Sequence, residues 1–233
     1  MILATDGTGM ARATIFTDRH DAGRRLAAEL PEFDPAQTVV LALPRGGVPV
    51  AEEICRARGL PLDLLMVRKI GMPGQPELAA GAVADGPHPI TVVNSRIAGA
   101  YGLDDARVEA MGRDLLPEIA RRRALYLGDR ARPEIAGKTV VLVDDGAATG
   151  ATLRVGLLAA RKAGAKRLIL ALPVAAPDVL EELSRLADVA ICLDTPRMFR
   201  AVGGSYATFS QVSDAEVVAA MARCAGDGSA DAG

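Results

Sequence analysis

Short apolar runs alternate with amphipathic stretches along most of the chain, and this alternation predicts an α/β fold. The apolar runs are continuous and rich in Val, Ile and Leu, which is typical of strands buried on both faces. These predicted strands cover residues 38–43, 63–67, 90–93, 138–143, 167–172 and 189–193. The stretches between them repeat apolar residues every three or four positions, which predicts helices. The predicted helices cover residues 18–30, 48–58, 104–126, 153–164, 178–186 and 214–224.

Strands that alternate with helices form a parallel sheet with helices on both faces. Neither an internal repeat nor a linker interrupts the pattern. We therefore expect one domain at residues 15–224, between a mobile tail at 1–14 and a disordered end at 225–233. Gly and Pro are frequent at residues 68–89, which predicts a long loop around a short β-ribbon at 81–85.

Ligands of such sheets bind at the carboxyl ends of the strands. The site is therefore expected in the segments that follow strands 38–43, 63–67, 139–143 and 189–193.

Residues 140–152, VVLVDDGAATGAT, carry the strongest functional signal. Small residues follow a buried strand and lead into a helix, so that backbone N–H groups and the helix dipole can hold a phosphate. The two glycines permit a tight turn, and the two threonine hydroxyls can add hydrogen bonds. The candidate phosphate-binding residues are Gly146, Ala147, Ala148, Thr149, Gly150, Ala151 and Thr152.

Two acids, Asp144 and Asp145, lie between the strand and this loop. They cannot face a phosphate without repulsion, so they must face sugar hydroxyls, a cation, or both. A 5-phosphorylated ribose satisfies both requirements. An ordinary strand-to-helix turn with a solvated acid pair is the alternative for the acids alone. The chain lacks G-x-x-x-x-G-K-[ST], which argues against a nucleoside-triphosphatase loop.

The thirteen residues 140–152 resemble the motif with which type I phosphoribosyltransferases bind 5-phosphoribosyl 1-pyrophosphate (PRPP). The resemblance extends from about residue 16 to 218 and is strongest to bacterial predicted phosphoribosyltransferases whose acceptors are unassigned. It implies a Rossmann-like parallel sheet flanked by helices, with a flexible lid loop at 68–89 and a small C-terminal hood at about 195–212.

The resemblance also implies an activity and its partners. The enzyme would be a pentosyl-transferring glycosyltransferase that moves 5-phosphoribose from PRPP to a small nucleophile and releases pyrophosphate. Mg²⁺ would be the cofactor, held through PRPP and by Asp144 and Asp145, and the protein would be a homodimer. A PRPP-binding regulatory protein without turnover is the alternative function.

Two further segments resemble parts of the family's donor site. Arg45, Gly46 and Gly47 follow the strand at 38–43 and resemble the pyrophosphate loop, although a glycine-rich turn alone is an alternative. Arg68 and Lys69 follow the strand at 63–67 and are expected to clamp the leaving pyrophosphate, with a solvated charged edge as the alternative. The expected catalytic residues are Asp144, Asp145, Lys69, Arg68 and, as a candidate base in the lid, Glu77.

Three aromatic residues, Phe199, Tyr206 and Phe209, lie close together near the C-terminal end. They are candidates for a hood that stacks on a planar acceptor, with the segment near residues 16–18 as a further candidate part of it. A small satellite core under a loop is the alternative. Residues 121–123, three consecutive arginines on the long helix, are expected to form a solvated face rather than a site.

Ala148 bears on the acceptor. Enzymes of the family that act on 6-oxopurines usually carry an Asp at this position of the motif, so hypoxanthine and guanine become less favoured. Adenine, a modified base, and an amine or hydroxyl of another small molecule stay open.

Charge and composition exclude some classes of function. The net charge of −2 gives no electrostatic reason to expect nucleic acid or an anionic membrane as a partner. Cys55, Cys192 and Cys224 lack metal-site spacing. No signal peptide or membrane span is indicated, so a cytoplasmic location is expected.

Overall fold

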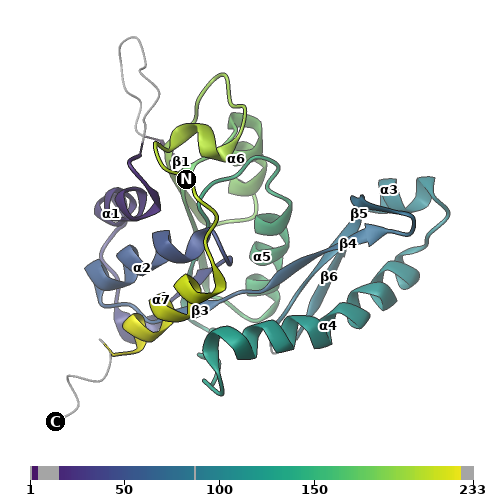
Figure 1. Cartoon of the computed structure of the whole chain (residues 1–233), viewed down its shortest axis with the longest axis horizontal. Helices are drawn as coiled ribbons and strands as arrows, with labels where there is room; N and C mark the ends of the chain where they lie inside the picture. Colours follow the sequence, from purple (N-terminus) through teal and green to yellow (C-terminus); the bar gives the residue numbers. More distant parts are fainter. Residues whose placement is uncertain (1, 5–15, 87, 227–233) are drawn as a thin grey trace.

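A six-stranded parallel sheet forms the centre of the computed structural model, which describes residues 2–4, 16–86 and 88–226 (Figure 1). The strand order is β1-β9-β8-β7-β2-β3, and each neighbouring pair is parallel. The strands are β1 (Ile2–Ala4), β2 (Thr38–Ala42), β3 (Leu62–Leu64), β7 (Thr139–Val143), β8 (Arg167–Val174) and β9 (Val189–Asp194). The predicted parallel sheet is confirmed, and β1 is a strand within the segment that was expected to be a tail.

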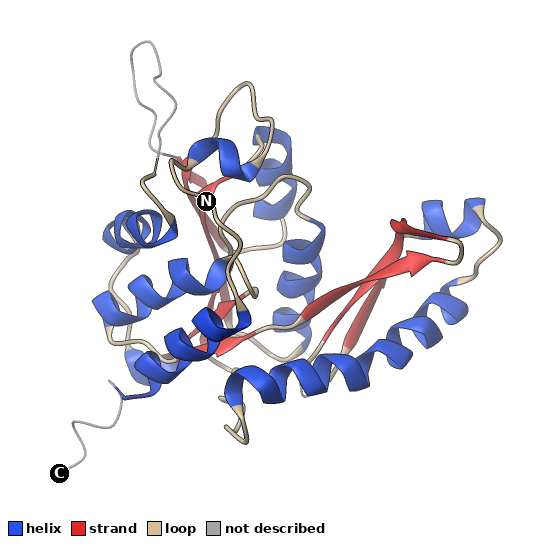
Figure 2. Ribbon diagram, in the orientation of Figure 1, coloured by secondary structure: helices blue, strands red, loops and turns tan. Residues whose placement is uncertain are grey.

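Helices cover both faces of this sheet (Figure 2). They are α1 (Arg19–Glu29), α2 (Gly47–Arg58), α5 (Ala151–Lys162), α6 (Pro177–Ser184) and α7 (Asp214–Gly226). Side chains alternate along each strand, so Val141 and Val143 belong to the core cluster that includes residues of α1, α2 and α7, whereas Val140 and Leu142 belong to the cluster that includes residues of α5 and α6. Among the described residues, no helix is long and apolar enough to cross a membrane.

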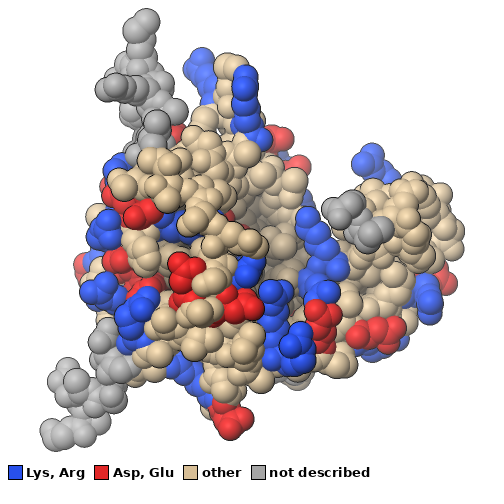
Figure 3. Space-filling view, viewed as in Figure 1, with Lys and Arg blue, Asp and Glu red and all other residues tan. Residues whose placement is uncertain are grey.

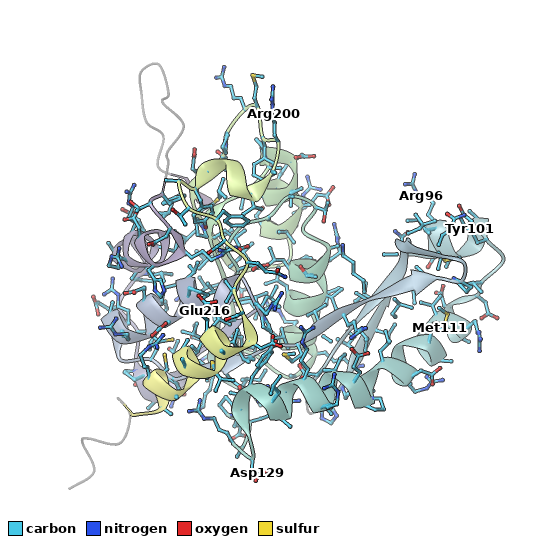
Figure 4. The ribbon with its side chains drawn as sticks, in the orientation of Figure 1. Arg96, Tyr101, Met111, Asp129, Arg200 and Glu216 are labelled. Atoms are coloured by element: carbon cyan, nitrogen blue, oxygen red, sulfur yellow. The ribbon has the colours of Figure 1, made fainter. Side chains whose placement is uncertain are left out.

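A second, antiparallel sheet and a long helix form an arm that extends from the parallel sheet (Figure 1). Its elements are β4 (Val67–Met72), β5 (Gln75–Ala84), β6 (Ile90–Val93), α3 (Ser95–Ala100) and α4 (Asp105–Leu127). Figure 4 places Arg96 and Tyr101 at the tip of this arm. Most of the segment that was expected to be a loop is therefore strand.

The β-ribbon expected at 81–85 lies within β5 as far as residue 84, and glycines occupy specific positions in the strands that replace the rest of the predicted loop. Gly74, at φ 77°, occupies the tight turn between β4 and β5, where a side chain would be strained. Gly81 lies inside β5, and a Cβ there would lie 2.4 Å from the carbonyl oxygen of Val92 on β6. The close approach of two strands, rather than a chain break, accounts for this glycine.

The predicted strand at 63–67 is also divided between two sheets. Leu62–Leu64 pairs with β2 in the parallel sheet, whereas Val67 begins β4 of the arm. The strand at 90–93 likewise belongs to the arm and runs antiparallel to β5. Except for residues 2–4, 225 and 226, the two predicted tails lie outside the described residues.

A buried ion cluster joins the arm to the parallel sheet. Arg123 of α4 donates two hydrogen bonds to the carboxylate of Asp63 on β3, at 2.7 and 2.8 Å, and one to the carbonyl of Leu64 at 2.7 Å. Asp85, after β5, accepts from the backbone N–H of Met66 at 2.8 Å and from Arg132 at 2.6 Å. These buried carboxylates and guanidinium fix α4 against the ends of both sheets.

The prediction of a solvated face for the three arginines was therefore wrong for Arg123. Arg121 is exposed, Arg122 is half-buried and Arg123 is buried. Successive residues of a helix point about 100° apart, so three neighbouring side chains meet three different environments.

We expect Arg123→Met to lower the free energy of unfolding by about 3–5 kcal/mol, because it leaves the buried carboxylate of Asp63 without its partner. Urea unfolding at pH 7 measures this. The exposed neighbour supplies the control, since Arg121→Met should change stability by less than about 0.5 kcal/mol. Equal stability of the two variants would contradict the structural role of the cluster.

Candidate functional site

The loop between β7 and α5 forms a cradle of free backbone N–H groups. The backbone N–H groups of residues 148–153 donate no hydrogen bond to any other described residue. Gly150, at φ 65°, turns the chain into the 12-residue helix α5, and a Cβ there would lie 2.8 Å from Val179. Thr149 is exposed and Thr152 is half-buried, and neither hydroxyl is bonded to another described residue. The cradle therefore offers donors and a helix N-terminus to an anion.

The acid pair lies against the loop that follows β2. A Cβ added to Gly46 would lie 2.1 Å from Oδ2 of Asp145, and one added to Gly47 would lie 2.7 Å from the carbonyl oxygen of Val143. Since β2 and β7 are neighbours in register, their carboxyl ends bring the two loops into contact. The structure thus brings together the predicted acid pair and the predicted pyrophosphate loop.

Arg19, which the sequence did not single out, binds Asp145. Its Nε donates to Oδ2 of Asp145 at 2.7 Å, and its Nη1 donates to the carbonyl oxygen of Ser210 at 2.8 Å. The guanidinium carbon lies 3.9 Å from the centre of the Phe209 ring. Arg19 and Asp145 are 126 positions apart. Their spacing in the sequence carries no signal of this contact, which only the packing of α1 creates.

Burial raises the pKa values of both acids of the pair. For Asp144, loss of solvent and the neighbouring charge of Asp145 raise the pKa well above its usual range. The pKa of Asp145 is also raised by burial, and the ion pair with Arg19 opposes that effect. The backbone N–H of Asp145 donates to Oδ1 of Asp144 at 2.9 Å. Two partly buried acids with little compensation are a pattern found at functional sites.

A basic cavity of about 400 Å³ lies between the loop after β2, the strand β4 and the helix α4. It brings together the three cations predicted to bind pyrophosphate, Arg45, Arg68 and Lys69, and adds Arg122. Arg68 forms an ion pair with Glu118 of α4. Figure 3 shows the surface hollowed between the arm and the rest of the molecule, with Lys and Arg side chains along the hollow.

A second cavity of about 380 Å³ lies beside Asp145. Arg19, Arg45 and Gly46 line it together with residues 209–212, so Arg45 borders both cavities. Of the three predicted hood aromatics, Phe209 lines this cavity and is 38% exposed.

The other two hood aromatics belong to a small core. Tyr206 is buried, its hydroxyl donates to the carbonyl oxygen of Asp145 at 2.6 Å, and its ring centre lies 5.4 Å from that of Phe16. Phe199 packs on the same cluster. In the same segment, Arg200 points outward at the far end of the molecule (Figure 4). The satellite core is therefore present, and the predicted stacking on an acceptor stays a prediction.

Glu77 lies on β5, and its side chain lies outside the described part of the chain, so its predicted role as a base is not tested. Ala148 lies exposed in the cradle. No group of three or more metal-ligating side chains occurs among the described residues. The acid pair alone fits a magnesium ion that keeps most of its ligands as water and substrate oxygens.

Fold and site together define an α/β protein with an anion cradle, an acid pair and a basic cavity at the carboxyl edge of its sheet. Residues 14–204 match the family model of the phosphoribosyl transferase domain. The chain belongs to this family, as the motif at 140–152 indicated.

Two curated proteins and one protein of known structure resemble the chain over 90% of its length. Two Mycobacterium tuberculosis proteins, from strains CDC 1551 and H37Rv, carry the provisional name phosphoribosyl transferase and are 44% identical over 209 residues. The chain spans only 47% of their length. The crystal structure of TT1426 from Thermus thermophilus is 38% identical and superposes with a TM-score of 0.76, and 98% of that chain is covered.

We expect Asp144→Asn to raise the free energy of unfolding by about 1 kcal/mol at pH 8, because it removes a buried charge beside Asp145. A raised pKa in the folded state means that the stabilising effect of this group is complete below about pH 4 and is lost as the pH rises through the raised value. The gain in stability should therefore grow from pH 5 to pH 8. Urea unfolding of both proteins across this range measures it.

Asp188 supplies a control of opposite sign. Partial burial there is outweighed by the hydrogen bond from Leu168 and the ion pair with Arg161, so that the pKa is lowered. Asp188→Asn should lose stability at neutral pH, and the loss should shrink as the pH falls. A gain for Asp144→Asn that does not depend on pH would contradict the proposed cause.

Proposed function

We propose that this protein transfers 5-phosphoribose from PRPP to a small nucleophile and releases pyrophosphate. The observation that carries the proposal is the meeting of three features at one sheet edge: the cradle after β7, the acid pair, and the basic cavity. Each suits a different part of PRPP. Since the chain spans about half the length of its curated relatives, the activity is proposed for this domain.

In this proposal, the donor's 5-phosphate accepts hydrogen bonds from the N–H groups of residues 148–153, and its ribose hydroxyls donate to Asp144 and Asp145. The pyrophosphate lies in the basic cavity, against Arg45, Arg68 and Lys69. Mg²⁺ bound with PRPP would neutralise part of the pyrophosphate charge. The acid pair is the candidate protein contact of that ion.

The reaction breaks the bond between ribose C1 and the pyrophosphate oxygen, forms a bond from C1 to the acceptor, and removes the proton that the attacking nitrogen or oxygen carried. By analogy with glycosyl transfer, positive charge develops on the ribose ring as the first bond breaks. The carboxylates of Asp144 and Asp145 favour that charge, while the cations of the basic cavity stabilise the leaving pyrophosphate. Both effects need the donor to be held in one orientation, which the cradle supplies.

The acceptor is proposed to enter the cavity beside Asp145 that Phe209 lines. Ala148 offers no acid to handle a purine N7 proton, so 6-oxopurines are disfavoured. Adenine, a modified base, or another small amine or hydroxyl stay as candidates. The homodimer and the cytoplasmic location stay predictions.

Turnover is tested by incubating the full chain with PRPP, Mg²⁺ and a panel of acceptors, and by measuring released pyrophosphate. The panel should contain adenine, hypoxanthine, modified bases and small amines. We expect release that depends on one acceptor class and is weak with 6-oxopurines. Tight PRPP binding without release from any acceptor would instead support the regulatory alternative.

Gly46→Ala tests the donor site. The backbone of Gly46, at φ −60° and ψ −37°, accepts alanine. The added Cβ would lie 2.1 Å from Oδ2 of Asp145, so the carboxylate would have to move away. We expect PRPP binding, measured by calorimetry, to weaken by at least about tenfold. Gly99→Ala is the control, because its Cβ would have no neighbour within 4 Å. Unchanged affinity in Gly46→Ala would exclude Asp145 from the donor site.

A further inference from the structure

Four cationic side chains among the described residues line the basic cavity. One of them lies outside every segment that the sequence predicts to bind PRPP. This residue is Arg122 of α4. Arg45 comes from the loop after β2, and Arg68 and Lys69 come from β4. The cavity is thus closed on its third side by a helix that contributes its own positive charge.

The two neighbours of Arg122 are engaged elsewhere. Arg123 is buried in its ion pair with Asp63, whereas Arg121 is exposed and does not line the cavity. In the described part of the chain, the ion pair of Arg122 is with Asp214, at 3.8 Å, and 42% of its side chain is exposed. Its guanidinium is therefore positioned at the cavity but only loosely bound.

Asp214, at the start of α7, contacts two cations of the cavity. Its Oδ1 accepts a hydrogen bond from the hydroxyl of Tyr126 at 2.6 Å and lies 3.4 Å from Nη1 of Arg45. The Tyr126 hydrogen bond and the nearby Arg122 and Arg45 hold the pKa of this carboxyl below its usual range. The group is thus an anion at neutral pH, placed between guanidiniums from two different elements.

We propose that Arg122 binds the pyrophosphate group of the donor, and that Asp214 is the counter-ion of Arg122 and Arg45 while that group is absent. Glu118 has the same relation to Arg68 in this cavity. Each guanidinium of the cavity is therefore paired with a carboxylate, and a more highly charged anion can take the place of those carboxylates. This inference rests on the proposed function and adds a binding residue to it.

The test is calorimetric titration of the full chain with inorganic pyrophosphate in the presence of Mg²⁺. We expect Arg122→Gln to weaken binding by about 10- to 100-fold, because a charge-assisted contact is lost. Arg121→Gln is the matched control: it removes the same charge from the adjacent position, and its affinity should stay within about twofold of the native value. Comparison of the two separates a direct contact from a general loss of positive charge.

Asp214→Asn separates binding from structure. It breaks the same ion pair as Arg122→Gln but keeps the cation, and the asparagine oxygen can still accept from Tyr126. We expect pyrophosphate to bind about 3- to 10-fold more tightly to this variant, because a competing negative charge is gone. If Arg122 served only to hold α7 in place through Asp214, both variants would bind more weakly.

Two results would overturn the inference while the proposed function stands, provided that the native protein binds and turns over PRPP. One is equal pyrophosphate affinity of Arg122→Gln and Arg121→Gln. The other is weaker pyrophosphate binding by Asp214→Asn than by the native protein. A native protein that binds neither PRPP nor pyrophosphate would overturn both. Thermal unfolding of each variant identifies a folding defect, and the opposite signs expected for Arg122→Gln and Asp214→Asn cannot both arise from one.

Discussion

The parallel pairing of β2 with β7 imposes the constraint on which the site depends. It brings the end of each strand so close to the other that side chains cannot occupy both loops. Asp144 and Asp145 fill the space on one side, and glycines at 46 and 47 leave it free on the other. The acids are consequently held in partial burial, which raises the pKa of Asp144 and makes the ionised pair costly for the folded protein. Arg19 offsets that cost for both acids, and it forms its ion pair with Asp145.

The arm makes the second half of the site, and its position depends on charges that no ligand would touch. The ion pair of Arg123 with Asp63 holds α4 beside β3, and the hydrogen bond from Met66 to Asp85 joins the ends of β4 and β5 nearest the parallel sheet. With α4 in that position, the buried Arg123 points toward the core, and the half-buried Arg122 of the same helical turn lines the cavity. A ribbon built on strands, rather than a loose loop, then holds Arg68 and Lys69 opposite the loop after β2.

Local sequence patterns predicted those features of the fold and the site that depend on residues close together in the chain. The apolar runs located five of the six parallel strands, all but β1, and the motif at 140–152 located both cradle and acids, because each is a continuous segment. Arg19 could not be found this way, since its contact with Asp145 depends on how α1 packs. Gly74 misled the prediction, because a glycine in a tight turn between two strands looks the same in sequence as one in a long loop. The three arginines at 121–123 misled it for a similar reason, because composition does not reveal which way each side chain points.

Charge balance connects these parts. An unliganded cavity with several uncompensated guanidiniums would repel itself, and the carboxylates of Glu118 and Asp214 relieve that repulsion. Both carboxylates lie on helices, α4 and α7, that pack against the site from outside the parallel sheet. A pyrophosphate group carries more charge than either carboxylate, so it can displace them without leaving a cation unpaired. If the cavity binds pyrophosphate as proposed, the helices that complete it also moderate its affinity for that group, because donor binding then competes with ion pairs within the protein.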